Sequence, residues 1–119
     1  MNITEQTEEL KGHLIRLKER FENTTPPENR RDRDFFQMVK DETSPVYKSL
    51  ATWEEDVLGI VKERRVNVHP QQVASTRENM ELLIMHSYFI DARKKRYMEL
   101  FNSVVYIFDQ LLNELSENK

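Results

Sequence analysis

The segment YMELFNSVVYIFDQLLNEL, residues 97–115, places large apolar side chains at alternating steps of four and three residues. An α-helix has 3.6 residues per turn, so this spacing puts all of these side chains on one face of a helix. The stripe consists of Tyr97, Phe101, Val104, Phe108, Leu111 and Leu115. Stripes of the same period run through almost every segment from Ile3 onward. The sequence therefore predicts an all-α protein.

A first helix is predicted to open near Thr4, whose hydroxyl can accept a hydrogen bond from a free amide of the first turn. Glu5 follows at the positive end of the helix dipole. We expect this helix to end at residues 24–27, Thr-Thr-Pro-Pro, because proline supplies no amide donor and disfavours helix in the residue before it. Its predicted core face comprises Ile3, Leu10, Leu14, Leu17 and Phe21.

A second helix is predicted to begin around residues 32–34 and to contain Pro45. Ser44 and Pro45 together resemble an N-cap followed by a first helical residue, so a kink or a restart is expected there. The apolar stripe keeps its phase across the proline, which favours a kinked continuous helix over two unrelated ones. The predicted stripe comprises Phe35, Phe36, Val39, Val46, Leu50, Trp53, Val57 and Ile60.

The remainder of the chain, from Pro70 onward, permits two interpretations. Residues 71–119 contain no proline or glycine, so a single helix of roughly 48 residues would be compatible with the sequence. A helix of that length would leave its distal half unburied unless the chain dimerised. We favour a reversal near Asp91, a good capping residue, beside which Lys94 interrupts the apolar stripe. Residues 1–119 then form one domain, a four-helix up-and-down antiparallel bundle.

Composition excludes several classes of protein. The chain has 119 residues, a net charge of −3 and no cysteine, which excludes disulfides, thiolate zinc sites and cysteine nucleophiles. It has no run of 18 apolar residues, and its polar, acidic start differs from a signal peptide. We therefore expect a cytoplasmic protein that does not enter a membrane.

Several short motifs stand out in the last two-thirds of the chain: Glu78-Asn79-Met80, His86-Ser87-Tyr88, Lys95-Arg96, Ser103-Val104-Val105-Tyr106, and the stretch from Asp34-Phe35 to Val39 followed by Trp53. These motifs resemble the YppE-like family, a group of small uncharacterised proteins from Bacillus and its relatives. The resemblance implies a four-helix up-and-down bundle in the bacterial cytoplasm. It implies no catalytic or ligand-binding residues.

Catalytic and metal-binding patterns are not evident in the sequence. Carboxylate-bridged metal sites in bundles use Glu-x-x-His pairs, but apolar residues precede His13, His69 and His86 by three positions. His86 and Ser87 are adjacent, and neighbours along a helix point in different directions, so adjacency does not pair a base with a nucleophile. We expect no enzyme activity, cofactor or metal.

Three tyrosines and four methionines have a structural interpretation. Tyr88, Tyr97 and Tyr106 are predicted to lie at the edge of the core with their hydroxyl groups in water. The methionines are predicted to fill gaps in the core rather than to form a partner-binding surface. They are Met38, Met80, Met85 and Met98.

Two basic clusters lie near predicted helix starts, where positive charge opposes the helix dipole at a cost of about 0.3–1 kcal/mol per site. The sequence predicts that both clusters meet at one end of the bundle, diluted by Glu28, Asp32, Asp34 and Asp91. Salt bridges to these carboxylates are one interpretation, and a surface for an anion or a partner is the other. The clusters consist of Arg30, Arg31, Arg33, Arg93, Lys94, Lys95 and Arg96.

These patterns favour a non-enzymatic protein that acts by contacting another macromolecule. A protein partner is the leading interpretation, and nucleic acid or another phosphate-rich ligand bound at the basic end is the alternative. A monomer is favoured over a homodimer. For a compact chain of this kind we expect a radius of gyration of about 14–16 Å.

Overall fold

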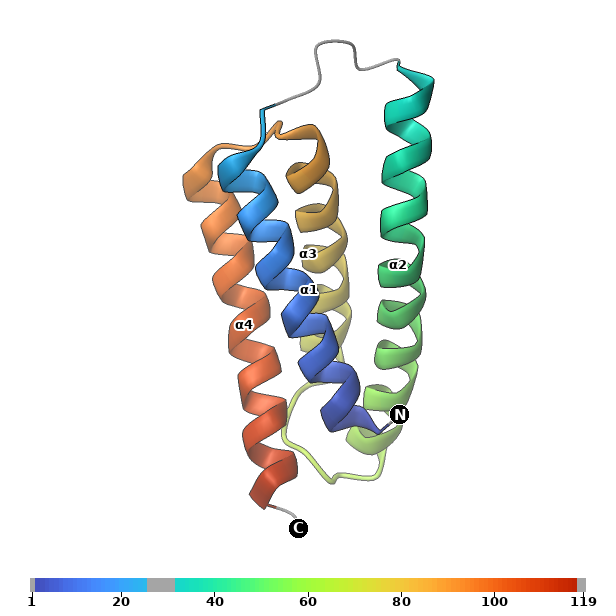
Figure 1. The fold of residues 1–119 in the computed structure, drawn as a ribbon. Coiled ribbons are helices and arrows are strands. Elements are labelled where there is room, and N and C mark those ends of the chain that lie inside the picture. Colours follow the sequence, from blue (N-terminus) through green and yellow to red (C-terminus); the bar gives the residue numbers. More distant parts are fainter. Residues whose placement is uncertain (1, 26–31, 118–119) are drawn as a thin grey trace.

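The computed structural model describes residues 2–25 and 32–117. These residues form four helices that run alternately up and down (Figure 1), which confirms the predicted all-α four-helix bundle. The radius of gyration is 15.2 Å, inside the expected range, and the bundle measures 49 × 27 × 21 Å. The helices are α1 (Ile3–Asn23), α2 (Arg33–Lys62), α3 (Pro70–Phe89) and α4 (Lys94–Glu117).

The start of α1 differs from the prediction by two residues. Asn2, and not Thr4, is the N-cap, because its Oδ1 accepts a hydrogen bond of 2.8 Å from the Glu5 amide. Asparagine is as good a cap as serine or threonine, and capping from Asn2 brings Ile3 into the helix. The C-terminal end is as predicted: α1 stops at Asn23 and Thr24 is extended. Pro26 and Pro27 lie outside the described residues.

The helix α2 is continuous through Pro45, as the phase of its stripe indicated. Asp32 caps it, with Oδ1 accepting hydrogen bonds from the amides of Asp34 and Phe35. Pro70 is the first residue of α3, a position that suits its fixed φ and its missing N–H. His69 caps α3 through Nδ1, which accepts from the Gln71 amide at 3.0 Å.

The reversal between α3 and α4 falls where it was predicted, so residues 71–119 do not form one helix. Ile90 ends α3 in the left-handed conformation, with φ 49° and ψ 50°. A left-handed residue turns the chain out of the helix, although a β-branched residue seldom adopts this conformation. Asp91 lies within the turn, where one of its carboxylate oxygens is 2.5 Å from Nδ1 of His86.

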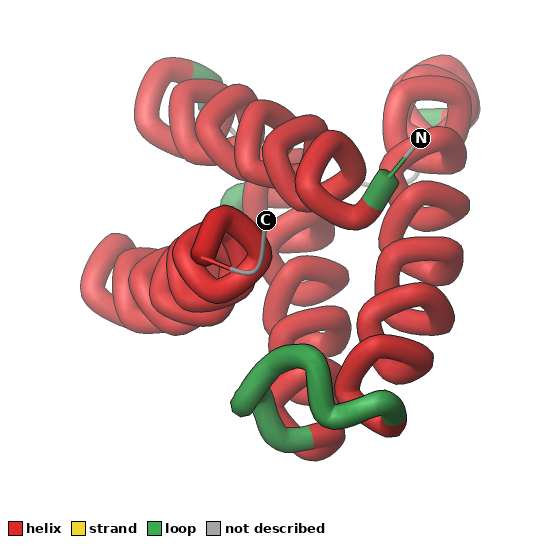
Figure 2. Tube along the Cα trace, turned by 90° about the horizontal axis from the view of Figure 1, so that it is seen from below, coloured by secondary structure: helices red, strands yellow, loops and turns green. Residues whose placement is uncertain are grey.

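The four helices are not equivalent in their packing. Among the described residues, every pair of helices except α2 with α4 brings Cα atoms within 8 Å, so α1 and α3 form the short diagonal of the bundle. Figure 2 views the bundle from the end with the α2–α3 loop. Long side chains span the other diagonal, where the rings of Trp53 and Phe108 meet edge to face at 5.4 Å.

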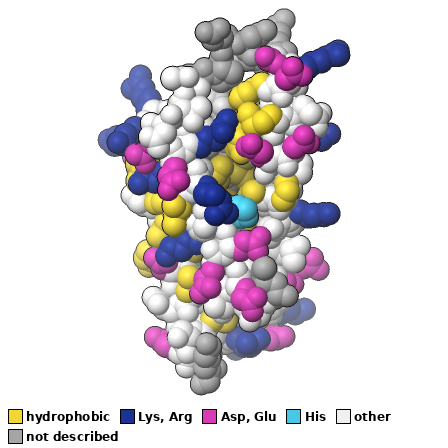
Figure 3. All heavy atoms as spheres, in the orientation of Figure 1, with side chains coloured by type: hydrophobic (Ala, Val, Ile, Leu, Met, Phe, Trp, Pro, Cys, Tyr) yellow, Lys and Arg dark blue, Asp and Glu magenta, His cyan; other side chains and the backbone are white. Residues whose placement is uncertain are grey.

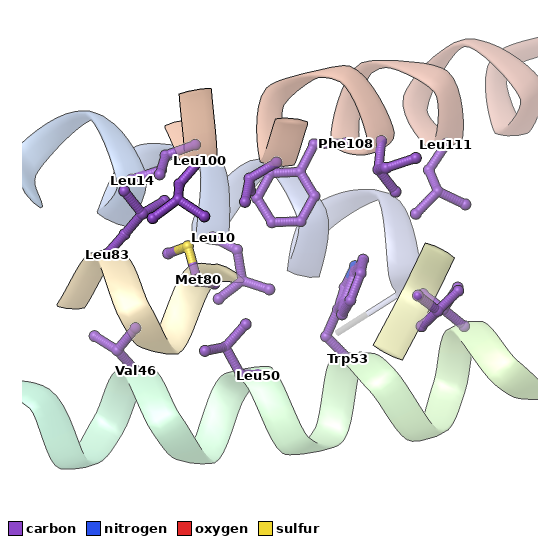
Figure 4. Close-up of a cluster of buried hydrophobic side chains, with 14 of the residues drawn as sticks. Leu10, Leu14, Val46, Leu50, Trp53, Met80, Leu83, Leu100, Phe108 and Leu111 are labelled. Atoms are coloured by element: carbon purple, nitrogen blue, oxygen red, sulfur yellow. The ribbon is translucent and has the colours of Figure 1, made fainter. Parts of the chain in front are cut away.

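The predicted stripes supply the core (Figure 4). Each helix contributes fully buried side chains, among them Leu10 and Leu14 of α1, Leu50 of α2, Met80 of α3 and Leu111 of α4. Two predictions about side chains of the core are wrong at exposed positions. Phe36 of the α2 stripe is 44% exposed, and Met85 is exposed rather than a filler of the core.

Candidate functional site

One end of the bundle collects basic side chains from two helices. The start of α2, the turn between α3 and α4, and the start of α4 all lie at the upper end in Figure 1. We call the described residues of this cluster the basic end, and all of them are exposed: Arg33, Arg93, Lys94, Lys95 and Arg96. Arg30 and Arg31, predicted to belong to the same cluster, lie outside the described residues, as does Glu28.

The two helix starts at the basic end differ in charge balance. Arg33 lies between Asp32, the N-cap of α2, and Asp34 in its first turn. The first turn of α4 contains no acidic residue. Its positive charges therefore add to the positive end of the helix dipole, which is unfavourable by about 0.3–1 kcal/mol per site. Stability alone does not explain this arrangement.

Ion pairing compensates little of the charge on α4. Arg96 pairs weakly with Glu99, with 3.8 Å between Nη1 and Oε2 of two exposed side chains. In the part of the chain that the structure describes, no carboxylate lies within 4 Å of Arg93, Lys94 or Lys95. The positive charge at the start of α4 is therefore available to a ligand.

An aromatic cluster, made of Phe35, Phe36 and Phe89, lies at the same end and joins α2 to α3. The ring centroid of Phe89 lies 5.5 Å from that of Phe35 and 5.8 Å from that of Phe36. Arg33 precedes Phe36 by one helical turn, and Arg93 follows Phe89 by four residues. Exposed apolar surface and positive charge therefore lie at the same end of the bundle.

A second candidate surface is a groove of about 360 Å³ between the upper parts of α1 and α2, with α3 behind it. We call it the α1–α2 groove. Figure 3 shows this face, on which basic side chains and a histidine border apolar side chains. The lining residues are His13, Arg16, Leu17, Arg20, Glu42, Val46 and Tyr88.

His13 and Arg16 interact along one side of the groove. Nη2 of Arg16 lies 2.9 Å from Nδ1 of His13, and a guanidinium can only donate, so Nδ1 is the acceptor. Burial and the neighbouring Arg16 guanidinium lower the pKa of His13 below its usual value, against the opposing effect of Glu9. The imidazole is therefore neutral at pH 7, and the groove carries its positive charge on arginine.

Arg20 and Tyr88 form the inner wall of the groove. The guanidinium carbon of Arg20 lies 4.2 Å from the centroid of the Tyr88 ring, a cation–π contact. The Tyr88 hydroxyl donates a hydrogen bond of 2.6 Å to Oε2 of Glu42. Burial, followed by the hydrogen bond to Glu42, raises the pKa of Tyr88 to about 12. The phenol is therefore a fixed donor, and not a base, at neutral pH.

The buried pair Ser87 and Tyr97 corrects the prediction that the Tyr97 hydroxyl reaches water. Both side chains are fully buried, and their oxygens are 2.6 Å apart. The Ser87 hydroxyl also donates to the Leu83 carbonyl, which leaves Tyr97 as the donor to Ser87. The Tyr97 ring stacks on Phe21 at 4.0 Å. This pair links α3 to α4 inside the core. Burial raises the pKa of Tyr97 to about 12, so the phenol is neutral at pH 7.

The motif that contains His86 and Ser87 does not assemble a catalytic pair. Nδ1 of His86 contacts Asp91, whereas the Ser87 hydroxyl contacts Tyr97. The two side chains therefore have different hydrogen-bond partners. The described residues hold no group of three histidine, aspartate or glutamate side chains that could bind a metal ion. No helix within these residues is both long and apolar enough to cross a membrane.

Sequence reasoning missed the α1–α2 groove. A signal for it exists in α1, because His13, Arg16 and Arg20 are three and four residues apart and share one side of the helix. This row of polar residues flanks the apolar stripe. Glu42 and Tyr88 are 46 residues apart and meet only through the packing of α2 on α3.

Comparison with known proteins gives the chain a family. The model of a bacterial domain of unknown function, DUF1798, matches residues 7–115. The uncharacterized protein YppE of Bacillus subtilis (strain 168) is 30% identical over 84 residues, which cover 70% of this chain and 68% of YppE.

Two solved structures of YppE from Bacillus subtilis have the same fold. The crystal structure has a TM-score of 0.84 and 25% identity, over 97% of this chain and 93% of that one. The solution NMR structure has a TM-score of 0.80 and 23% identity, over 98% and 95% of the two chains. The predicted resemblance is thus confirmed: the chain belongs to the DUF1798 family of bacterial domains of unknown function, whose members include proteins similar to YppE.

Proposed function

We propose that this protein is a non-enzymatic cytoplasmic binding protein that, as a monomer, docks an acidic segment of another protein. The docking surface is the basic end together with the aromatic cluster. The observation that carries the proposal is the absence of carboxylates around Arg93, Lys94 and Lys95 in the described structure, at the same end of the bundle as Phe36, which is 44% exposed.

The combination of charge and aromatic surface has the composition of a protein-binding site. Interface centres are enriched in aromatic residues and arginine, and exposed apolar side chains next to charge mark interaction sites. Complementary charge speeds the encounter and fixes the register of the partner, while the rings supply buried area. A partner that fits would present acidic side chains beside apolar ones.

Site-specific photocrosslinking tests this proposal. A benzoylphenylalanine placed at position 36 should yield discrete crosslinked proteins in bacterial cells, and the double charge reversal Lys94→Glu, Lys95→Glu should abolish them. The same probe at position 106, which is 66% exposed on α4, is the matched control. Crosslinks that are the same at both positions, or that persist in the charge-reversed variant, would contradict the proposal.

Binding of nucleic acid or another phosphate-rich ligand is a second candidate. It is favoured by three consecutive cations at the N-terminus of α4, the helix end that attracts phosphate. Fluorescence anisotropy of labelled single- and double-stranded nucleic acid, at low and physiological salt, tests it. Salt-sensitive binding that Lys94→Glu, Lys95→Glu abolishes would support this candidate.

The control for the charge reversal, in both experiments, is the double variant Lys62→Glu, Arg64→Glu. It changes the charge by the same amount at the opposite end of the bundle, on exposed residues. Binding that both double variants reduce equally would reflect net charge and not the basic end. An absence of binding at either salt concentration would exclude nucleic acid.

A further inference from the structure

We propose that the α1–α2 groove is a binding site for a small organic oxyanion, a phosphate or carboxylate group attached to an apolar body. This inference goes beyond the proposed docking function and uses a different surface. It rests on two guanidinium groups, one buried unpaired donor and an apolar floor within a single groove.

The positive charge of the groove lacks a matching acid. Arg16 and Arg20 are one helical turn apart, so both project toward the groove from α1. Within the described chain, no carboxylate lies within 4 Å of either guanidinium. Glu42 is the only acidic residue of the lining, and one of its oxygens is already occupied by the Tyr88 hydroxyl. The lining therefore carries a net charge of +1, with Arg16 and Arg20 set against Glu42 and with His13 neutral.

Arg20 is held in place before any ligand arrives. The Tyr88 ring supports its guanidinium at 4.2 Å, and the Glu42 hydrogen bond fixes Tyr88 in turn. The Nε–H of Arg20 is buried and has no hydrogen-bond partner. Buried donors without acceptors are rare in folded proteins. A ligand oxygen beside Arg20 would provide the missing acceptor after a small rotation of the guanidinium.

Arg16 supplies the second donor group. Its guanidinium uses only Nη2 for His13, which leaves its other N–H groups for a ligand. Guanidinium groups bind phosphate and carboxylate through two parallel hydrogen bonds, so this pair of arginines suits either oxyanion.

The apolar part of the ligand has a surface to rest on. Leu17 of α1 and Val46 of α2 line the groove between the charged side chains. The volume of about 360 Å³ lies at the lower end of the range for small-molecule sites. The groove therefore fits a ligand with one ring or a short chain.

His13 provides a built-in reporter of occupancy. An anion beside Arg16 would favour the imidazolium form and would draw the guanidinium away from Nδ1, so the pKa of His13 should rise. The charged groups that act on the pKa of His13 are Arg16 and Glu9 on α1. The other charged or titratable groups of the groove are Arg20 on α1, Glu42 on α2 and Tyr88 on α3.

The test is an NMR titration of the ¹³C,¹⁵N-labelled protein with phenyl phosphate and, separately, with benzoate. Benzyl alcohol is the neutral control. We expect either anion to shift the signals of His13, Arg16, Arg20 and Tyr88, and the ¹³C-detected pKa of the His13 ring to rise when the site is saturated. The anion with the lower dissociation constant identifies the oxyanion, phosphate or carboxylate, that the groove prefers. Equal binding of benzyl alcohol would show that the oxyanion is not recognised and would overturn the proposal.

Variants localise the binding. Arg16→Gln and Arg20→Gln should each weaken binding about tenfold or more, because each removes charge-assisted hydrogen bonds. Lys62→Gln, the same charge change on an exposed residue at the far end of α2, should leave the dissociation constant unchanged. Arg16 is exposed, so Arg16→Gln keeps the test valid even if Arg20→Gln fails to fold.

Two results would contradict the site. One is a dissociation constant that Arg16→Gln and Lys62→Gln alter equally. The other is a set of shifted signals confined to Lys94 and Lys95, which would assign the anion to the basic end. Because the docking proposal predicts crosslinks at position 36 and makes no prediction for this groove, the two proposals can fail separately.

Discussion

The seam between α1 and α2 differs along its length. Near the α2–α3 loop its inner side is closed by a buried tryptophan, beneath a surface groove lined by Gln6 and Thr52, and we call this the closed part. Toward the basic end the seam is lined by charged side chains, and we call this the open part.

In the closed part, the Trp53 side chain is fully buried, and its Nε1–H donates a hydrogen bond of 3.0 Å to Oγ1 of Thr7. In the open part, Arg16, Arg20 and Glu42 face each other across a groove. The same two helices thus share a buried core contact in one part and a groove edged by charged side chains in the other.

The difference follows from where α2 begins to bury its side chains. No residue of α2 before Thr43 is buried, whereas Val46, Leu50, Trp53, Val57 and Ile60 are buried at successive turns after it. Where the core is thin, charged side chains such as Arg16 and Glu42 border the seam and stay exposed to water. Within this bundle, a ligand site is therefore expected near the part of α2 whose apolar side chains are least buried.

The largest expected effect breaks the closed part of the seam. Trp53→Ala should lower the free energy of unfolding by about 3–5 kcal/mol, because it leaves a cavity and removes the contact with Phe108. Urea denaturation measures the change. Tyr106→Ala, at an exposed site, should stay within about 0.5 kcal/mol. Equal losses in the two variants would mean that Trp53 does not hold the core together.

A second effect should appear at alkaline pH, where Tyr88 in the open part of the seam and Tyr97 in the core both have a pKa of about 12. Between pH 10 and pH 12 the unfolded chain releases these protons while the folded protein keeps them, so stability falls as the pH rises. Each tyrosine should contribute a loss of roughly 2–3 kcal/mol, complete near pH 12.

The variant Tyr88→Phe separates the two contributions. Urea denaturation at pH 9 and pH 11.5 should show a smaller difference in this variant than in the parent protein. Tyr106→Phe, at an exposed position, is the control and should retain the full difference. A pH dependence that Tyr88→Phe leaves intact would contradict the burial of the Tyr88 phenol.

A smaller effect probes the hydrogen bond inside the closed part. Thr7→Val keeps the size of the side chain but leaves the Trp53 N–H without an acceptor, which should cost about 1–3 kcal/mol. Thr52→Val is the matched control, because Thr52 is exposed and bonds only within its own helix. If the two variants unfold at the same urea concentration, the indole has found another partner.

The smallest expected change in stability concerns the hydrogen bond between Tyr88 and Glu42 in the open part. Glu42→Gln should change the free energy of unfolding by less than about 0.5 kcal/mol, since glutamine still accepts the Tyr88 hydrogen bond at an exposed position. The pKa of Tyr88 should nevertheless fall part of the way toward its usual value, because burial is the larger cause of its shift. Ultraviolet titration of tyrosinate, with Asp41→Asn as control, measures it.

The fold was predictable because helix packing follows a local period. The stripe of α4, the uninterrupted phase of α2 and the reversal near Asp91 all depend on residues close together in the sequence. The start of α1 was misplaced for an equally local reason, since Asn2 and Thr4 are both good caps and only the geometry decides between them.

The candidate sites were predictable only in part. The basic residues of α4 were placed correctly at one end of the bundle because topology alone determines which helix ends meet. The groove was not, because its inner wall depends on contacts such as Tyr88 with Glu42 that no periodicity encodes. Tyr97 was misjudged for the same reason, since its buried partner Ser87 lies on another helix.

Pro45 divides α2 at the point where burial begins, and it has no N–H to bond the carbonyl of Asp41. The turn of α2 at Pro45 therefore has one backbone hydrogen bond fewer than the other turns of this helix. The turns before Pro45 should open and close separately from the rest of the bundle, and their amides should exchange with deuterium sooner than those after Leu50. A helix that looks like one rod would then behave as two units on the timescale of local opening.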